Sequence, residues 1–371
     1  MKSRALWLKK GDRNTKFFHR FANNRREINS IWEILSDSRI KLHSQEEISK
    51  EVVSYFGNFY KRDDNCSIED ILWGIDHFPT MFEDEQNNTF FQPITENELF
   101  EVMKSFKKDT NLGPHGWTIE FYIHFFELFK KDILAMVEES WMRGSFHPRI
   151  TSTYISLIPK KKKAIAFSNF RPISLCNEIY KISSKIIASR IRGTLSNYVS
   201  LEHHGFLKNR NIIEAVANTQ ECLHSLHSKK LGATILQLDL KKAYDSLDWG
   251  FLRCILCKIG LKKESIGWIM ARVENVNFVV LINGHPTNFF AAARGLRQGC
   301  SLSPLLFILA MDSLSLHINC AVKEDHHRPI RICRGSFISH SLFVDDIMIF
   351  DMLCRLTWEC IHGILRNFQK A

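Results

Sequence analysis

Apolar residues recur with helical spacing in several stretches of this chain. Between residues 178 and 195, Ile182 and Ile186 fall on one face while Lys185 falls elsewhere, and this pattern predicts an amphipathic helix. The same reasoning predicts further helices over residues 121–141, ended by Gly144, over 211–227 and, as an apolar core helix, over 303–319.

Short apolar runs bounded by turn residues predict strands between these helices. Residues 278–282 form such a run, and the Asn283-Gly284 pair that follows predicts a hairpin with a primed turn. Two more apolar runs, 235–239 and 342–350, contain aspartates. Because strands and helices mix without a strict βαβ period, we predict an α+β fold.

The run 342–350 carries Asp345 and Asp346 at its centre, where the sequence predicts the turn between two short buried strands. Adjacent carboxylates repel each other, and apolar surroundings already disfavour their ionised form. A bound divalent cation would relieve both effects. By contrast, Asp63 and Asp64 lie in a polar stretch where water solvates them, and we predict a plain loop there.

A metal site needs a partner carboxylate, and Asp239 ends the apolar run 235–239. If that run is a strand beside the Asp345-Asp346 hairpin, three carboxylates converge at one sheet edge, as two-metal phosphoryl transfer requires. We predict Asp239 and Asp345 as direct ligands and Asp346 as the third member, holding two Mg²⁺ ions about 4 Å apart, with Mn²⁺ as a substitute. The alternative is an aspartate that caps a helix and an unrelated turn.

A series of short motifs follows in a fixed order along most of the chain. They are Trp7-Leu8-Lys9-Lys10-Gly11-Asp12, Gly113-Pro114-His115-Gly116, Leu157-Ile158-Pro159-Lys160, Phe170-Arg171-Pro172, the Asp239 segment, Arg294-Gly295-Leu296-Arg297-Gln298-Gly299 and Phe343-Val344-Asp345-Asp346. With these motifs the chain resembles the reverse transcriptases of non-LTR (LINE-type) retrotransposons, specifically the plant members. The resemblance implies an RNA-directed DNA polymerase that adds dNTPs to a DNA primer on an RNA template.

The resemblance also implies how the chain is divided into domains. It predicts a right-hand polymerase with fingers over residues 96–230 and an incomplete palm over 231–371, whose sheet carries the carboxylates. A basic N-terminal extension, 1–62, and an exposed, partly flexible acidic connector, 63–95, would precede them. The primer-gripping thumb and the endonuclease domain of such polyproteins are expected to be missing, so that the chain is truncated at both ends.

A nucleotide-binding set follows from the same resemblance: Lys160, Arg171, Tyr244, Gln298 and Gly299. Lys160 and Arg171 flank a basic loop expected to hold the triphosphate, and a guanidinium is a planar donor suited to phosphate. Gly299 permits close backbone approach, and Gln298 can hydrogen-bond the nucleotide or the template. The alternatives are a solvated charge run at 161–163 and a plain strand-to-helix turn at 298–299.

Tyr244 distinguishes DNA synthesis from RNA synthesis. It stands shortly after Asp239, so one strand-to-turn segment can place the carboxylate on the metals and the ring under the sugar of the nucleotide. A large ring there excludes a 2′-hydroxyl by steric clash, which favours DNA as the product. RNA as the template comes from the resemblance alone.

Charge is distributed unevenly along the chain, whose net charge is +10. The segment from Lys2 to Arg26 is dense in Lys and Arg, whereas residues 63–103 contain neither. We predict that the basic segment contacts RNA phosphates through Lys9, Lys10, Arg13, Lys16, Arg20 and Arg25. The alternative is a helix whose basic face is merely solvated.

The ten cysteines are scattered, and the close pair Cys254 and Cys257 has no matching second pair. Reduced thiols in an intracellular protein are therefore preferred over zinc or disulfides. We find neither a signal peptide nor an apolar stretch of the roughly 20 residues that span a membrane. We expect a soluble nuclear or cytoplasmic protein.

Three departures from the plant relatives bear on activity. His115 stands where they have Asp, Val344 where they have Ala, and Cys300-Ser301 where they have Asp-Pro. None of these removes a predicted metal ligand, but the turn beside the nucleotide changes. Two functions therefore stay open, a Mg²⁺-dependent polymerase core and a catalytically inactive retroelement fragment with residual nucleic-acid binding.

Overall fold

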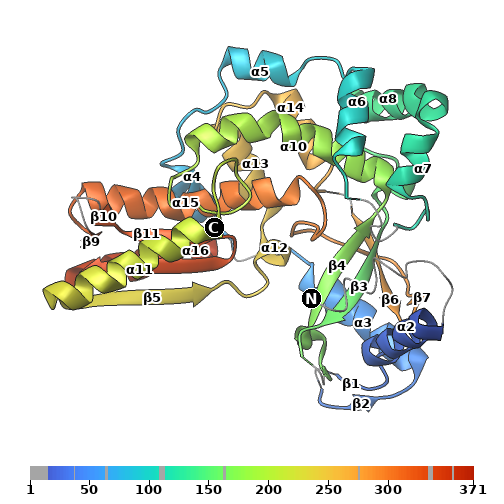
Figure 1. The fold of residues 1–371 in the computed structure, drawn as a ribbon, viewed down its shortest axis with the longest axis horizontal. Coiled ribbons are helices and arrows are strands. Elements are labelled where there is room, and N and C mark those ends of the chain that lie inside the picture. Colours follow the sequence, from blue (N-terminus) through green and yellow to red (C-terminus); the bar gives the residue numbers. More distant parts are fainter. Residues whose placement is uncertain are drawn as a thin grey trace.

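The computed structural model describes residues 16–36, 38–62, 66–107, 113–161, 164–274, 276–332, 337–352 and 355–371. Two larger sheets lie side by side in this part of the chain, and helices cover them (Figure 1). Mixed helices and strands agree with the predicted α+β class. Asp63 and Asp64, predicted as loop, lie outside the described residues.

A run of helices between residues 45 and 151 separates the first two strands from the others. The helices are α2 (Lys16–Asn29), α3 (Gln45–Phe59), α4 (Ile68–Ile75), α5 (Asp84–Phe90), α6 (Glu96–Lys104), α7 (Ile119–His124), α8 (Phe126–Arg143), α9 (Pro148–Thr151), α10 (Glu178–Tyr198), α11 (Ile212–Lys229), α12 (Ala243–Ser246), α13 (Trp249–Lys258), α14 (Lys263–Met270), α15 (Ser303–Lys323) and α16 (Arg355–Lys370). The strands are β1 (Ile34–Leu35), β2 (Lys41–Leu42), β3 (Thr153–Pro159), β4 (Phe170–Cys176), β5 (Ala233–Asp239), β6 (Asn277–Ile282), β7 (His285–Pro286), β8 (Phe290–Ala291), β9 (Ile330–Arg331), β10 (Phe337–Ile338), β11 (His340–Phe343) and β12 (Asp346–Met352).

The first sheet has the antiparallel order β11-β12-β5. Side chains alternate between its faces because the period of a strand is two residues. Ile347 and Ile349 join the main core, which includes the apolar residues of α15, whereas Met348 and Phe350 pack on the other side in a cluster with Cys222 of α11. The sheet is therefore held between two helices, and its Asp346 end stays at the edge.

The second sheet has the order β4-β3-β6-β7, with β8 also paired to β6. Strands β3 and β6 run parallel, whereas β3 and β4 form an antiparallel hairpin. Helix α3 packs on this sheet through Val52 and Phe56, which share a core cluster with Ile155 and Val280. The N-terminal segment is thus part of the fold around this sheet.

The hairpin and the helices predicted over 178–195, 211–227 and 303–319 are confirmed within small shifts of their ends, whereas the helix predicted over 121–141 is divided at Phe125 into α7 and α8. Helix α8 ends at Gly144, which adopts the left-handed conformation that favours glycine. Asn211 caps the start of helix α11, and its side chain accepts a hydrogen bond from the Ile213 amide. Asn283 and Gly284 both have positive φ, as a primed hairpin turn requires.

The interpretation of residues 63–95 as an exposed connector is wrong for the described part of that stretch. It contains helices α4 and α5, and Phe78, Met81 and Phe90 are buried in the main core. Apart from Asp76, which follows α4, the acidic side chains of the described part lie at helix starts, where carboxylates favour helix formation, as Asp70 does in the capping box of α4.

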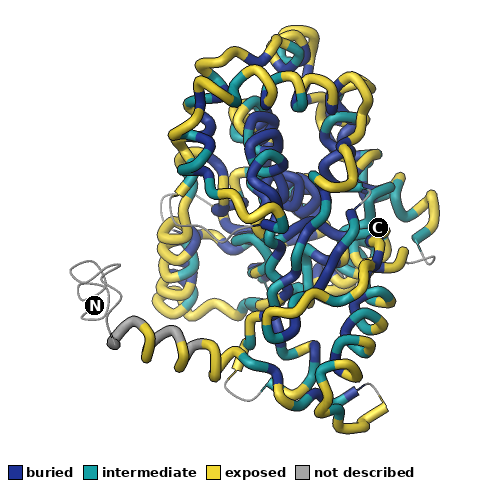
Figure 2. The backbone as a smooth tube through the Cα atoms, turned by 90° about the vertical axis from the view of Figure 1, so that its right-hand side faces the viewer, coloured by how far each residue is buried: buried dark blue, intermediate teal, exposed yellow. Residues whose placement is uncertain are grey.

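Helix α15 corrects the expectation that no stretch approaches the length of a membrane span. By length and composition it could cross a membrane, but 78% of its most apolar window is buried inside the fold. Core helices of soluble proteins have the same properties, so this is weak support for a span. Figure 2 shows the buried centre of the molecule enclosed by exposed segments.

Candidate active site

Three predicted aspartates meet at one end of the first sheet. Asp239 is the last residue of β5 and Asp346 the first of β12, and the two are partners across the antiparallel pair. Such partners have Cα atoms about 5 Å apart. Asp345 lies in the turn before Asp346, and its carbonyl accepts a hydrogen bond from the Leu240 amide at 3.2 Å. The predicted convergence of the three residues is thus present in the backbone.

Burial and the neighbouring negative charges both act on Asp346 at this edge. Partial burial and the negative charges of Asp345 and Asp239 together raise the pKa of the Asp346 carboxyl. The expected burial, however, is only partial, because Asp346 and Asp239 are exposed and Asp345 is half-buried. Water therefore reaches Asp239 and Asp346, and the case for a cation depends also on the negative charges that lie together at this edge.

The three carboxylates suit a divalent ion by their chemistry, since Mg²⁺ prefers oxygen ligands. As the side chains stand, no group of three His, Cys, Asp or Glu residues in the described segments could hold a metal ion. Asp239 and Asp346 would have to turn toward a shared ion. Both are exposed, so such rotamer changes meet little packing resistance.

Tyr244 lies in α12, close to this edge. Its ring stacks on Phe307 of α15, with centroids 4.4 Å apart, and its carbonyl accepts a hydrogen bond from the Leu296 amide at 2.6 Å. Burial and then the charge of Asp345 raise the pKa of the Tyr244 hydroxyl. The predicted sugar-excluding ring is therefore firmly held beside a predicted metal ligand.

Gln298 and Gly299 form a turn packed against β4. The Gln298 carbonyl accepts a hydrogen bond from the Ser174 amide at 2.9 Å, and its side-chain Nε2 donates to Asp245 Oδ2 at 3.1 Å. Gly299 has φ +120°, and a Cβ at this position would lie 2.9 Å from the Ser174 carbonyl oxygen. Only glycine fits there without strain.

Lys160 and Arg171 lie at the loop end of the β3–β4 hairpin, where both are exposed. Lys160 is close enough to Asp245 for its positive charge to lower the pKa of that carboxyl. Among the described residues, Arg171 has no hydrogen-bond or ion-pair partner for its side chain. The structure thus groups Lys160 with Gln298 around Asp245, and it leaves Arg171 exposed on the strand.

The predicted nucleic-acid-binding segment is described only in part. Lys9, Lys10 and Arg13 lie outside the described residues, and Lys16 and Arg25 belong to α2, where Arg20 is exposed. The end of this helix is anchored where the Ile31 amide donates to Asn283 Oδ1 at 2.8 Å. Helix α2 is therefore tied to the β6–β7 turn.

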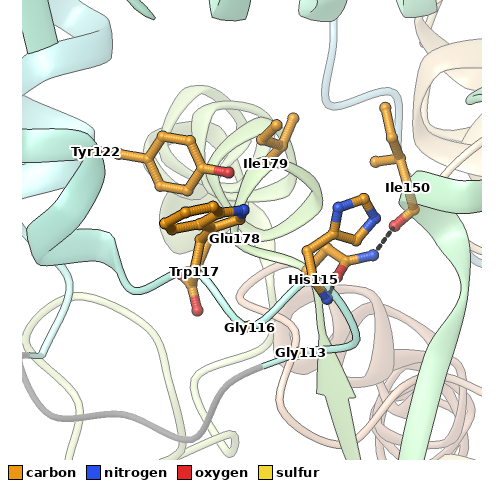
Figure 3. Close-up of a pocket in the computed structure, with 9 residues that line it drawn as sticks. Gly113, His115, Gly116, Trp117, Tyr122, Ile150, Glu178 and Ile179 are labelled. Carbon is orange, nitrogen blue, oxygen red and sulfur yellow. Dashed lines mark hydrogen bonds between the residues drawn. The ribbon is translucent and has the colours of Figure 1, made fainter. Parts of the chain in front are cut away.

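The loop that carries His115 has a structural role. Figure 3 shows His115 beside Ile150 and the start of α10. The His115 amide donates to Asn177 Oδ1 at 3.0 Å, and its ring nitrogen Nε2 lies 3.1 Å from the Arg149 carbonyl. A Cβ on Gly113 would collide with the Cys176 carbonyl. The cavity here is about 10 Å³, too small for a nucleotide, so His115 fixes the start of α10.

Sequence reasoning missed two residues of this region, Asp245 and Tyr60. Asp245 is 2% exposed, and it accepts a hydrogen bond from the Tyr60 hydroxyl at 2.8 Å. Burial raises its pKa to about 6, against the opposing effects of Tyr60, Lys242, Lys160 and Gln298. The available signal in the sequence was that Asp245 directly follows Tyr244, the residue predicted to exclude the 2′-hydroxyl.

Comparison with known proteins identifies the class of this fold and site. The family described as reverse transcriptase (RNA-dependent DNA polymerase) matches residues 158–357, more than half of the 371-residue chain. The chain therefore belongs to the reverse transcriptase family. Its domain is of the non-LTR retrotransposon type, as the sequence resemblance predicted.

The relatives include proteins of mobile elements. The chain is 27% identical over 316 residues to a transposon TX1 uncharacterized 149 kDa protein from Xenopus laevis, which covers 84% of this chain and 24% of that protein. It is 27% identical over 246 residues to the Pol polyprotein from a type-1 retrotransposable element R2 of Nasonia vitripennis, covering 64% and 22%.

A shorter relative matches more closely. The chain is 43% identical over 92 residues to an uncharacterized mitochondrial protein from Arabidopsis thaliana, which covers 24% of this chain and 75% of that protein. By contrast, the chain spans less than a quarter of the length of the longer transposon relatives.

Proposed function

We propose that this chain is the RNA-directed DNA polymerase core of a plant non-LTR retrotransposon. In this proposal it joins a dNTP to the 3′-hydroxyl of a DNA primer on an RNA template. One observation carries the proposal, namely that Asp239 and Asp346 pair across neighbouring strands with Asp345 and the Tyr244 ring beside them. Residues 96–230 would be the fingers and 231–371 the palm.

Each residue of the site has a role in this chemistry. Asp239, Asp345 and Asp346 would hold two Mg²⁺ ions, or Mn²⁺ in their place, and the ions would supply charge stabilisation to the attacking and leaving oxygens. The Tyr244 ring would exclude a ribose 2′-hydroxyl by occupying its space. Lys160 and Arg171 would bind the triphosphate, because both present exposed positive charge on the hairpin.

The basic extension, 1–62, would contact the RNA through Lys9, Lys10, Arg13, Lys16, Arg20 and Arg25. This role rests on the charge of the segment, and the exposed Arg20 and Arg26 of α2 agree with it. A nuclear or cytoplasmic location, where the RNA template is found, follows from the same proposal. The endonuclease that accompanies such polymerases would belong to another part of the polyprotein.

Primer extension on a homopolymer RNA template, with Mg²⁺ and separately with Mn²⁺, tests the proposed function. We expect extension by the wild-type chain and a loss of at least about 100-fold for Asp239→Asn, because one carboxylate ligand is removed. Asp325→Asn is the matched control, since Asp325 lies in an exposed left-handed turn that asparagine also favours. No extension with either ion would favour the inactive-fragment alternative.

A further inference from the structure

Asp245 joins three segments that are far apart in the sequence. Its Oδ1 accepts a hydrogen bond from the hydroxyl of Tyr60, which caps the end of α3. Its Oδ2 accepts one from Nε2 of Gln298, in the turn before α15. A carboxylate that is 2% exposed and held at both oxygens has a fixed orientation.

This arrangement fixes the side-chain amide of Gln298. An ionised carboxylate only accepts hydrogen bonds, so Gln298 must turn its NH₂ group toward Asp245 and its Oε1 away. None of the described residues donates a hydrogen bond to that Oε1. The Ser174 amide also holds the backbone carbonyl of Gln298. The side-chain Oε1 of Gln298 is therefore a hydrogen-bond acceptor with a fixed orientation.

Lys160 links the same acid to the predicted nucleotide site. The charged groups that act on Asp245 are Lys242, which follows β5, and Lys160, at the end of β3. With the hydrogen bonds from Tyr60 and Gln298, they oppose the burial that raises the pKa of Asp245 to about 6. At neutral pH the carboxylate is therefore ionised and able to hold Gln298.

The end of α3 is locked to the segments on both sides of this acid. The Ala293 amide donates to the Tyr60 carbonyl at 2.8 Å, and Arg294 Nη2 donates to the Phe59 carbonyl at 2.8 Å. The Lys242 ammonium lies 3.7 Å from the centre of the Phe59 ring. Tyr60 thus has little freedom to move, although it lies outside the matched family segment 158–357.

We infer that Asp245 is a positioning residue of the nucleotide site and that Tyr60, from the N-terminal segment, completes it. The two residues hold the Gln298 amide so that its Oε1 faces the incoming nucleotide. This inference rests on the proposed function. It makes the end of α3 part of the nucleotide site, whereas the basic segment before it serves the template.

Two single-atom-scale variants test the inference by steady-state primer extension with dTTP. Tyr60→Phe removes only the hydroxyl. Asp245→Asn replaces one carboxylate oxygen by an NH₂ group, which cannot accept the hydrogen bond that Tyr60 or Gln298 donates there. Each should raise the KM for dTTP about tenfold, as expected for losing one hydrogen bond to a charged group. The kcat should change much less, because the metal ligands are untouched.

Tyr55→Phe is the matched control for Tyr60→Phe. Its hydroxyl is on the same helix but accepts a hydrogen bond from Lys242 Nζ at 3.1 Å instead of reaching Asp245. Thermal unfolding of each variant shows whether it folds. A second readout is the pH dependence of KM. In the wild type the KM for dTTP should rise as the pH falls below about 6, because Asp245 is then protonated.

The pH midpoint separates positioning from simple packing. The Tyr60 hydrogen bond lowers the pKa of Asp245, so Tyr60→Phe should move this midpoint upward, and Asp245→Asn should abolish it. If Tyr60→Phe has the KM for dTTP and the pH midpoint of the wild type, the inference is overturned while the proposed function stands. If the wild type neither extends primers nor binds dTTP with Mn²⁺, the proposed function and the inference fail together.

Discussion

Asp239 and Asp346 face each other across β5 and β12, and this pairing is set by strand register alone. A shift of one residue would send one of them to the opposite face of the sheet, because side chains alternate along a strand. The buried Ile347 and Ile349 resist that shift, since it would remove both from the main core and exchange them with Met348 and Phe350 on the other face. The apolar residues of the hairpin therefore align the carboxylates.

Divalent ions should stabilise this chain through the aspartate pair. Mn²⁺ at about 100 times its Kd should add about 2.7 kcal/mol to the free energy of unfolding, measured as a rise in Tm. Asp239→Asn should remove most of this rise, and it should also lower the pKa of Asp346 by removing a negative neighbour. An equal Mn²⁺-dependent rise in Asp239→Asn would place the ion elsewhere.

The sequence predicted the active-site edge because its signal is local. Each apolar run predicts its own strand, and the aspartates at their ends need only antiparallel pairing to meet. The contact between Tyr60 and Asp245 joins residues 185 positions apart and leaves no periodic pattern, so it became visible only in the structure. The sequence interpretation of residues 63–95 relied on their acidic composition and gave no weight to the apolar Phe78 and Met81, which are buried in the main core.

Tyr244→Ala should admit ribonucleotides and largely preserve dNTP incorporation. The ring occupies space beside Asp345 without being a metal ligand, so its removal opens room for a 2′-hydroxyl. Losing the stack on Phe307 should also lower the free energy of unfolding by about 2 kcal/mol. Tyr244→Phe keeps the ring and is the control. If Tyr244→Ala rejects both sugars equally, the ring serves packing only.

Gly299→Ala should reduce both stability and nucleotide binding. The added Cβ meets the Ser174 carbonyl oxygen at 2.9 Å, and φ at +120° is strained for alanine. Together these effects should lower the free energy of unfolding by about 1–3 kcal/mol. Gly232→Ala, where nothing lies within 4 Å of the new Cβ, should be neutral by urea denaturation. Equal midpoints for the two variants would contradict this account of the turn.

Neutralising the basic extension should flatten the salt dependence of RNA affinity. Replacing Lys16, Arg20 and Arg25 with glutamine should reduce the slope of log affinity against log salt by about 0.7 for each RNA phosphate that the variant no longer neutralises. Lys104 and Lys130 are the control pair, because each already has a glutamate partner. A slope that matches the wild type would mean that the basic face of α2 is only solvated.

His340 should make the fold sensitive to acid. The side chain is buried, and hydroxyls of Ser315 and Ser339 lie 2.6 and 2.9 Å from its two ring nitrogens. Burial and then the neighbouring His203 and His327 lower its pKa to about 3. Its unfolded pKa is about 6.5, so its contribution to stability is complete above that pH and is lost as pH falls toward 3.

Urea denaturation between pH 6 and 4 measures this contribution. One proton taken up on unfolding corresponds to about 1.4 kcal/mol for each pH unit, and His340→Gln should reduce the slope of unfolding free energy against pH by about that amount. His326→Gln, at an exposed position, should leave the slope unchanged. Because the slope is compared and not the absolute stability, a general weakening of the fold by His340→Gln does not imitate the effect. Equal slopes in the two variants would mean that His340 is protonated alike in the folded and unfolded chain.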